Sequence, residues 1–347
     1  MKPISKYEMI RRIVSEFNQP AYRYKQITDA IFKQNVSEYE RMTMLPSFLR
    51  DELIRTLGPY VCSIVPVKEL KSRQVSKVLF AITGNEQVEA VRLSYERGWK
   101  SYCISTQCGC GFGCKFCATG TIGLKRNLTA DEITDQLLYF LLHGHSLDSV
   151  AFMGMGEALA NPYLFDALTI LTDPSLFGLG HRRITISTIG LLPGIEKLTR
   201  EFPQVNLTFS MHSPFDDQRS ELMPINDRFP VRDVLNTLDL HIRHTGRKVY
   251  IAYILLRGVN DSIAHAEAVA DLLRGRGPGE HLFHVNLIPY NSTEVTPESY
   301  QQSNRDQVTM FVRILKTKGI HVTVRTQFGT DIDAACGQLY GQGSEPT

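Results

Sequence analysis

Four of the seven cysteines of this 347-residue chain lie in one short stretch, QCGCGFGCKFCATG, at residues 107–120. Three of them, Cys110, Cys114 and Cys117, follow the spacing C-x3-C-x2-C. Three thiolates can hold three irons of a 4Fe-4S cluster and leave the fourth iron open to another ligand. The intervening glycines let a loop wrap closely around such a cluster. The spacing therefore predicts an iron–sulfur site with one open coordination position.

A structural zinc site is the alternative interpretation of the same stretch. Structural zinc takes four ligands, usually as two cysteine or histidine pairs separated by a longer loop. Here only Cys114 and Cys117 form a C-x2-C pair, and no second pair lies at the required distance. Cys108 would face the same side of an extended strand as Cys110, and we leave it out of the ligand set. The spacing favours the iron–sulfur cluster over zinc.

The elements that must position these cysteines alternate between strand and helix after Trp99. One amphipathic stretch, TADEITDQLLYFLLHG, opens with a capping box formed by Thr129 and Glu132. Alternating strands and helices predict an α/β fold with a parallel sheet, whose functional loops lie at the carboxyl ends of the strands. The cysteine stretch follows the first of these strands. The expected strands are SYCIST, SVAFMG, RITIST, NLTFSM, VYIAYILL, LFHVNLI and HVTVRT.

The chain before Trp99 follows different patterns. Residues 1–60 carry apolar residues at helical spacing, as in SKYEMIRRIVSEF, and predict a small N-terminal helical domain. Residues 61–98 hold KVLFAIT and QVEAVRLSY separated by GNE, which predicts a short β-hairpin extension. Residues 99–347 form the third region, with the alternating pattern.

Composition restricts the class of protein. With 43% hydrophobic residues, 21% charged residues and a net charge of +2, the chain is an ordinary globular protein without a strong global attraction to nucleic acid. The N-terminus has no apolar core of a signal peptide, and stretches such as QLLYFLLHG are too short to span a bilayer. An odd number of clustered cysteines favours a reducing compartment, so we expect a cytoplasmic protein.

Polar residues follow other expected strands as well. Because the carboxyl ends of parallel strands meet at one mouth, these side chains are expected to converge there. Taken singly, each also fits an ordinary turn or loop cap, and the third glycine of a dinucleotide fingerprint is missing after Gly156. The candidate ligand-binding positions are Gly156, Glu157, Ser187, Ser210, Met211, His212 and Asn291.

The C-x3-C-x2-C motif after the first strand resembles the signature of the radical S-adenosylmethionine (SAM) superfamily. This resemblance implies a partial (β/α)6 barrel in which Cys110, Cys114 and Cys117 hold a 4Fe-4S cluster. It also implies that SAM binds the open iron and yields a 5′-deoxyadenosyl radical on reduction. Gly156 and Glu157 would then bind the amino group of SAM, and the other strand-end residues would contact the rest of the cofactor.

Two thiols outside the cysteine stretch narrow the resemblance. From the residues alone, Cys103 is a small buried apolar side chain and Cys336 a filler near a helix end. However, VRTQFGTDIDAACGQL, which carries Cys336, is similar to the C-terminal signature of the Cfr and RlmN branch of ribosomal RNA adenine methyltransferases. In that branch residues 99–347 would form the catalytic barrel, with Cys336 on a C-terminal loop.

The same resemblance assigns catalytic roles to three residues. It also implies that each turnover uses two molecules of SAM. One SAM methylates Cys336, and the second supplies the radical that removes a hydrogen atom from the S-methyl group. Cys103 then forms a transient disulfide with Cys336 and releases the methylated adenine. Glu89 matches the acceptor of the base proton, although a carboxylate on a hairpin is also an ordinary solvated group.

Several stretches, including KRNLTADEITDQLLYF and KVYIAYILLRGVND, resemble the Cfr type most closely. Enzymes of this type methylate carbon 8, and secondarily carbon 2, of one adenosine in the peptidyl transferase centre of 23S rRNA, which gives resistance to antibiotics that bind there. The RlmN type has valine at the position of Cys108 and methylates carbon 2 in rRNA and a tRNA. For this chain, the resemblance to the Cfr type implies two partners, 23S rRNA and an electron donor such as a flavodoxin or ferredoxin. The chain is expected to be a monomer.

Three alternatives stay open. They are an RlmN-like carbon 2 methyltransferase, a glycyl-radical activating enzyme, and a non-catalytic iron–sulfur or zinc protein that binds RNA. The RNA would be held by local positive charge, although exposed basic residues are more often ordinary solvated surface. The candidate RNA contacts are Arg11, Arg12, Lys25 and Lys33 in the N-terminal helices, and Lys125 and Arg126 beside the cysteine stretch.

Overall fold

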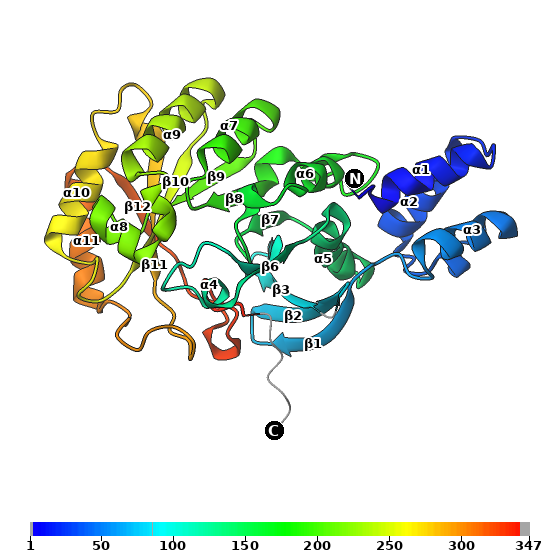
Figure 1. Ribbon diagram of the computed structural model, residues 1–347, viewed down its shortest axis with the longest axis horizontal. Coiled ribbons are helices and arrows are strands. Elements are labelled where there is room, and N and C mark those ends of the chain that lie inside the picture. Colours follow the sequence, from blue (N-terminus) through cyan, green and yellow to red (C-terminus); the bar gives the residue numbers. More distant parts are fainter. Residues whose placement is uncertain (1–2, 85, 341–347) are drawn as a thin grey trace.

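A ten-stranded sheet forms the centre of the molecule in the computed structural model, which describes residues 3–84 and 86–340 (Figure 1). The strand order is β1-β2-β3-β4-β7-β8-β9-β10-β11-β12. Within this sheet, neighbouring strands from β4 through β7 to β12 are parallel, as alternating β and α units require. Neighbouring strands from β1 to β4 are antiparallel. The parallel strands are β4 (Lys100–Cys103), β7 (Ser149–Phe152), β8 (Ile184–Thr188), β9 (Asn206–Ser210), β10 (Val249–Leu255), β11 (Phe283–Pro289) and β12 (His321–Val324).

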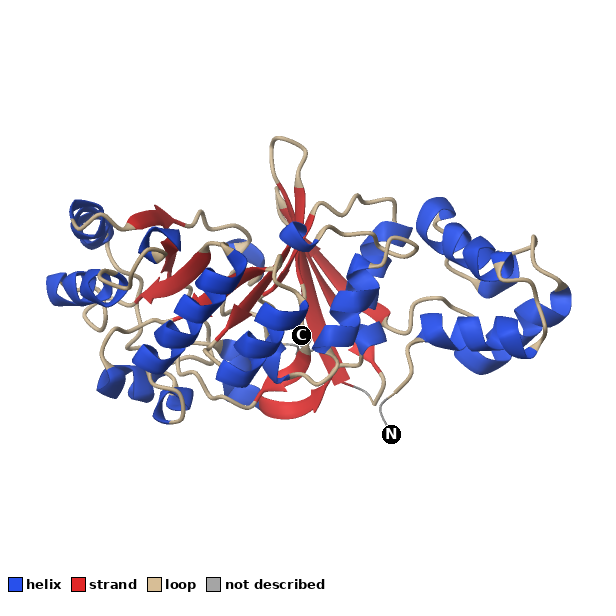
Figure 2. Cartoon of the chain, turned by 90° about the horizontal axis from the view of Figure 1, so that it is seen from above, coloured by secondary structure: helices blue, strands red, loops and turns tan. Residues whose placement is uncertain are grey.

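Helices cover one face of these parallel strands (Figure 2). Their apolar stripes join the sheet in one large core that includes Leu137, Leu168 and Phe311. The predicted α/β fold and the expected parallel strands are confirmed. These helices are α5 (Ala130–Leu142), α6 (Leu164–Thr172), α7 (Leu192–Glu201), α9 (Val231–Thr245), α10 (Ile263–Leu273) and α11 (Arg305–Thr317). Two shorter helices lie elsewhere: α4 (Ala118–Ile122) follows the cysteine stretch, and α8 (Asp216–Leu222) contributes Leu222 to a smaller cluster with Cys114.

The expected hairpin is present as β2 (Val75–Ile82) and β3 (Glu86–Ser94). A further strand, β1 (Val65–Lys71), pairs with β2. Its sequence VPVKELK has no alternating apolar pattern that would predict a strand. In the structure nearly every side chain of β1 is exposed. Since β3 pairs with β4, the antiparallel strands continue directly into the parallel part of the sheet, whose strand β4 precedes the cysteine stretch.

The N-terminal helices α1 (Lys6–Glu16), α2 (Tyr22–Gln34) and α3 (Ser47–Leu57) form a second, smaller core, which Leu138 of α5 joins. Residues at both ends of this helical unit, Lys6 at its start and Ser63 after it, contact one buried carboxylate, Asp135 of α5. The Lys6 ammonium pairs with Asp135, and the Ser63 amide donates to it at 2.7 Å. These charge-assisted bonds fix where the helical unit joins the sheet. No helix in the described ranges has the length and apolar character needed to cross a membrane.

Candidate active site

The cysteine stretch is more ordered than the loop that the sequence suggests. Its first part forms β5 (Gln107–Cys110), which pairs with β6 (Gly123–Asn127) in a two-stranded sheet. A Cβ atom on Gly109 would lie 1.8 Å from the Gly123 carbonyl oxygen, and one on Gly120 would lie 2.8 Å from the Cys114 carbonyl oxygen. Only glycine permits these approaches, so the stretch closes tightly on itself.

The three cysteines of the motif are buried or half-buried together. Burial raises the pKa of Cys110 to about 12, with a contribution from Cys117, and holds that of Cys114 well above its ordinary value. Burial also raises the pKa of Cys117. Thiols in such surroundings need nearby positive charge, such as iron, to become thiolate ligands. Three neighbouring free thiols in a glycine-lined turn fit a 4Fe-4S cluster. Within the described ranges, no three His, Cys, Asp or Glu side chains converge to hold a single metal ion.

A cavity of about 460 Å³, here called the thiol cavity, joins three cysteines that are far apart in sequence. Cys103 ends β4, Cys117 precedes α4, and Cys336 lies near the end of the described chain. Burial, with a smaller contribution from Cys336, raises the pKa of Cys103 to about 12. All three thiols are free in this structure. The fold therefore brings both thiols of the predicted disulfide exchange next to the predicted cluster.

Arg325 is a neighbour of Cys336 that the sequence interpretation missed. Its guanidinium Nη1 lies 3.7 Å from the Cys336 Sγ and 3.7 Å from the Met153 Sδ. Asn291, a predicted cofactor contact, donates from Nδ2 to the Cys336 carbonyl at 3.3 Å. Arg325 directly follows β12. The expectation that polar residues at the carboxyl ends of parallel strands converge on the site therefore applies to Arg325 as well.

Gly156 and Glu157 lie against β5. Gly156 has φ +93°, and a Cβ there would lie 2.4 Å from the Gln107 Cβ, which explains the glycine. The Glu157 carboxylate accepts hydrogen bonds from the amides of Leu159 at 3.3 Å and Ile189 at 3.0 Å. Burial raises the pKa of Glu157 to about 7. Glu157 is thus a buried carboxylate beside the cysteine stretch, able to receive a cation such as an ammonium group.

The predicted residues at the ends of β8 and β9 also come together. Ser187 Oγ and Ser210 Oγ are 3.4 Å apart. Met211 is fully buried, and its amide donates to the Ala252 carbonyl. His212 is buried, and its Nδ1 accepts from the Ile254 amide at 3.0 Å. Burial, with nearby Arg219, lowers the pKa of His212 to about 3, so the ring is neutral.

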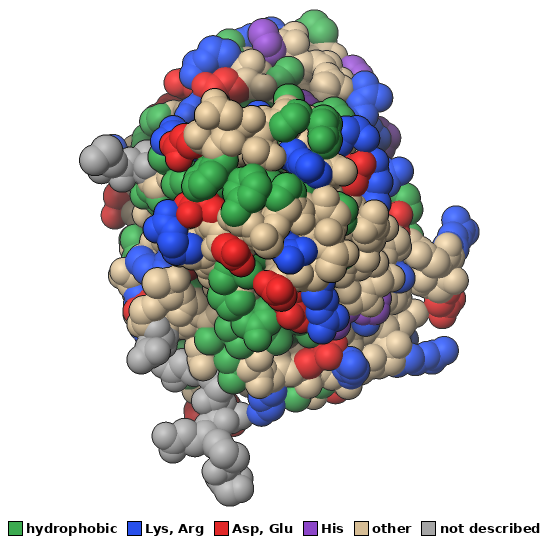
Figure 3. Space-filling view, turned by 90° about the vertical axis from the view of Figure 1, so that its right-hand side faces the viewer, with side chains coloured by type: hydrophobic (Ala, Val, Ile, Leu, Met, Phe, Trp, Pro, Cys, Tyr) green, Lys and Arg blue, Asp and Glu red, His purple; other side chains and the backbone are tan. Residues whose placement is uncertain are grey.

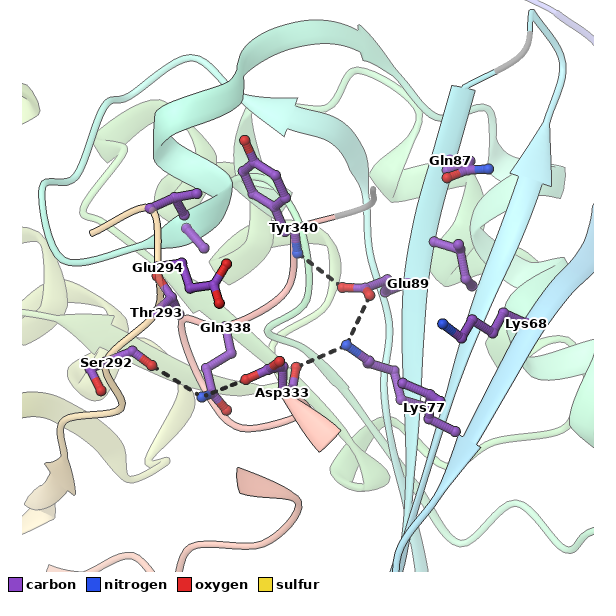
Figure 4. A pocket seen from close by; sticks show the side chains of 14 residues that line it. Lys68, Lys77, Gln87, Glu89, Ser292, Thr293, Glu294, Asp333, Gln338 and Tyr340 are labelled. Carbon is purple, nitrogen blue, oxygen red and sulfur yellow. Dashed lines mark hydrogen bonds and ion pairs between the residues drawn. The ribbon is translucent and has the colours of Figure 1, made fainter. Parts of the chain in front are cut away.

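Glu89 lines a different and larger cavity of about 1220 Å³, here called the Glu89 cavity (Figure 4). Its carboxylate pairs with Lys77 at 3.0 Å and accepts from the Tyr340 amide at 2.9 Å. Lys77 also donates to the Asp333 carbonyl at 3.1 Å. The residues from Asp333 to Tyr340 divide between this cavity and the thiol cavity. The structure thus places Glu89 beside the Cys336-bearing segment but outside the cavity of the thiols.

Comparisons with known proteins agree with this arrangement. The Radical SAM superfamily profile matches residues 104–273. The chain is 59% identical over 338 residues to "Ribosomal RNA large subunit methyltransferase Cfr" of Lachnoclostridium phytofermentans, covering 97% of this chain and 98% of the relative. The relative with the same name from Staphylococcus aureus is 60% identical, with 97% of each chain covered. A crystal structure of a radical SAM methyltransferase from Sphaerobacter thermophilus superposes with a TM-score of 0.90, 38% identity and 98% coverage of both chains.

Proposed function

This chain belongs to the radical SAM superfamily and, within it, to the Cfr family of large-subunit ribosomal RNA methyltransferases, and we propose that it methylates carbon 8 of an adenosine in 23S rRNA. Carbon 2 of the same adenosine is the secondary target. The target lies in the peptidyl transferase centre, and its methylation gives resistance to antibiotics that bind there. The Cfr name of the relatives supports the choice of carbon 8 over carbon 2.

The observation that carries this proposal is the presence of Cys103, Cys117 and Cys336 in one cavity. An adenine carbon is a poor nucleophile, so a simple displacement from SAM does not methylate it. A methyl group held first on a protein sulfur and then activated as a radical solves this problem. A non-catalytic iron–sulfur or zinc protein gives no use for two further free thiols beside the cluster stretch, and neither does a glycyl-radical activating enzyme.

When bound, the 4Fe-4S cluster and SAM supply the 5′-deoxyadenosyl radical. Cys110, Cys114 and Cys117 would hold the cluster, and Gly156 and Glu157 would bind the amino group of SAM. Ser187, Ser210, Met211, His212 and Asn291 are the remaining SAM contacts that we propose.

The Cys336 thiolate would attack the methyl carbon of SAM, and S-adenosylhomocysteine would leave; a second SAM would be used in the radical step. Arg325 and Asn291 fix the position of Cys336 for these reactions. After the methylene carbon has bonded to the adenine, the Cys103 sulfur attacks the Cys336 sulfur. The new S–S bond replaces the bond from the Cys336 sulfur to the transferred carbon, which leaves with the electron pair and takes up a proton to become the methyl group. Before this step the adenine adduct loses its unpaired electron, which the 4Fe-4S cluster would accept when bound. Glu89 accepts the proton of the attacked ring carbon. For this step the adenine must extend from the thiol cavity toward the Glu89 cavity.

We further propose 23S rRNA and a flavodoxin-like or ferredoxin-like electron donor as partners of a monomeric, cytoplasmic enzyme. On the N-terminal helices, Lys and Arg side chains are interspersed with Asp and Glu (Figure 3). Most of the expected RNA-contacting cations have acidic partners in the structure. They pair as Arg11–Asp173, Arg12–Glu8, Lys25–Asp29, Lys33–Asp29 and Arg126–Glu132.

The test is incubation of anaerobically reconstituted protein with an unmodified 23S rRNA fragment, followed by mass analysis of the nucleosides. We expect 8-methyladenosine as the main product, with a smaller amount of 2-methyladenosine. Formation of 2-methyladenosine alone would assign the chain to RlmN-like chemistry. Cluster-loaded protein that cleaves SAM and binds the fragment without methylating it would contradict the proposed function.

A further inference from the structure

A third cavity, of about 820 Å³, opens beside the thiol cavity at the turn between β3 and β4. We call it the turn cavity. It shares four lining residues with the thiol cavity, so the two are neighbouring spaces in the fold. None of the predicted cluster, SAM or catalytic residues lines the turn cavity. The shared residues are Tyr95, Ser101, Thr326 and Phe328.

Two exposed aromatic rings stand on this turn. Trp99 is 43% exposed and Tyr95 is 41% exposed. The turn that holds them is fixed, because the Tyr95 amide donates to the Trp99 carbonyl at 2.9 Å and Gly98 adopts φ +80°. The Trp99 Nε1 donates to Ser149 Oγ at 3.0 Å, which sets the direction of the indole. The rings are therefore held in place and still open to solvent.

The Tyr95 ring marks the boundary between the two cavities. It meets the Phe328 ring edge-on, with centroids 5.7 Å apart, and both rings line both cavities. Phe328 lies eight positions before Cys336 on the same C-terminal segment. A ligand that filled both cavities would pass this ring pair.

One arginine lies over the indole, and a second lines the cavity. The Arg183 guanidinium lies over the Trp99 ring at 5.5 Å from its centroid, and Arg97 lines the cavity. Glu96 is the acidic residue among the described lining residues. Aromatic faces combined with arginines are what proteins use to bind unpaired nucleotides, because every base offers a face for stacking and every nucleotide carries a phosphate.

We propose that the turn cavity binds the single-stranded RNA next to the target adenosine, with one flanking base stacked on Trp99. This inference rests on the proposed function. An adenine whose ring carbon is to be attacked must leave its stack and enter the thiol cavity, and its neighbours then lose a stacking partner. Trp99 supplies a replacement surface just outside that cavity. A protein partner would instead need a larger contact area than one such cleft offers.

Fluorescence gives the direct test, because Trp99 is the single tryptophan of the chain. The full protein is titrated with an unmodified 23S rRNA fragment and, separately, with a single-stranded oligoadenylate; heparin serves as a polyanion without bases. We expect saturable quenching of Trp99 emission by both RNAs and none by heparin. Binding of the fragment, seen by anisotropy of a labelled RNA end, with unchanged Trp99 emission would overturn the inference. If the fragment binds without being methylated, the proposed function fails, while the emission still decides this inference.

Kinetics provide the second test. Trp99→Ala is expected to raise KM for the rRNA fragment about tenfold with little change in kcat, since stacking of one base contributes roughly 1–3 kcal/mol. Trp99→Phe keeps an aromatic face and should stay within about threefold of the native KM. Leu240→Ala, at an exposed apolar residue of the outer helix α9, is the control and should change neither constant. An unchanged KM in Trp99→Ala, or an equal rise in Trp99→Phe, would overturn the inference.

Discussion

The cysteine stretch and the C-terminal segment, residues 325–340, carry thiols for one proposed reaction, but they are built in different ways. The cysteine stretch is paired with β6 and closes on itself at two glycines. The C-terminal segment has a single 3-10 turn, Thr330–Ile332, as its regular structure within the described chain. It is attached through separate contacts, including those of Lys77 with Asp333 and of Asn291 with Cys336.

This difference fits two kinds of work. Cluster ligands must keep one geometry throughout the reaction, so tight backbone packing suits them. In the proposed reaction the sulfur of Cys336 instead meets SAM, the adenine and Cys103 in turn. Within the described chain, the C-terminal segment is not paired into a sheet, and single backbone bonds such as that from the Ala118 amide to the Gly337 carbonyl, together with the buried Leu339, hold it. We therefore expect substitutions in the two regions to fail in different ways.

The largest effect is expected in the cysteine stretch. Cys110→Ala, Cys114→Ala and Cys117→Ala should each lose the cluster, cleave no SAM and methylate no RNA, because three thiolates are the minimum set for the cluster. Iron content and 5′-deoxyadenosine formation measure this. Cys108→Ala, in the same stretch, should keep both. Loss of iron in Cys108→Ala, or its retention in any of the other three, would contradict the assignment of ligands.

Substitutions of Cys336 and Cys103 should separate methyl transfer from cluster assembly. Cys336→Ala should keep native iron content and methylate no RNA. Cys103→Ala should also keep its iron but accumulate RNA joined covalently to Cys336, because the resolving thiol is missing. Gel electrophoresis detects the protein–RNA adduct, and iron analysis measures the cluster content of both variants. RNA methylation by Cys336→Ala at the native rate would remove this thiol from the mechanism.

A smaller effect is expected at the attachment of the C-terminal segment. Lys77→Met leaves the buried Glu89 carboxylate without its cation and should lower the free energy of unfolding by about 3 kcal/mol. Lys77→Met combined with Glu89→Gln removes both charges and should recover much of that loss. Denaturant unfolding of the two single variants and the double variant measures the coupling. Additive losses would show that the pair does not stabilise the segment.

The smallest effect concerns the pH dependence of stability. Burial holds the pKa of Glu157 at about 7 in the folded protein, above its ordinary value of 4.5. The stabilisation by its bound proton is full below the ordinary value and is lost as pH rises through about 7. Without cofactors, Glu157→Gln should therefore be more stable than the native protein at about pH 8.5, on the order of 2 kcal/mol, and similar to it near pH 4.5. A difference that does not change with pH would contradict the raised pKa.

The sequence predicts the repeating part of the fold well because each unit carries its own signals. The parallel strands are short apolar runs, and the capping box at Thr129 and Glu132 is present with both of its hydrogen bonds. The strand-end rule also gathers Ser187 with Ser210 and places Glu157 beside β5. These predictions depend on local patterns and on the general geometry of parallel sheets.

The parts that the sequence does not predict depend on tertiary pairing. The strand β1 is exposed along nearly its whole length and exists because β2 offers it a partner. The strand β5 holds four residues, one of them glycine, and its pairing with β6 depends on a close approach of two backbones. The bonds from Lys77 to Asp333 and from Tyr340 to Glu89 join residues 256 and 251 positions apart, for which one sequence carries no signal.

The most direct test of the central claim is the mass of the peptide that carries Cys336. The reconstituted protein is incubated with SAM and a reductant in the absence of RNA, digested and analysed by mass spectrometry. We predict one added methyl group, located on Cys336. When protein preloaded from methyl-deuterated SAM is then given unmodified 23S rRNA and unlabelled SAM, the labelled group leaves Cys336 and appears in the RNA. An unmodified Cys336 in protein that goes on to methylate RNA, or a methyl group on Cys103 instead, would contradict this account.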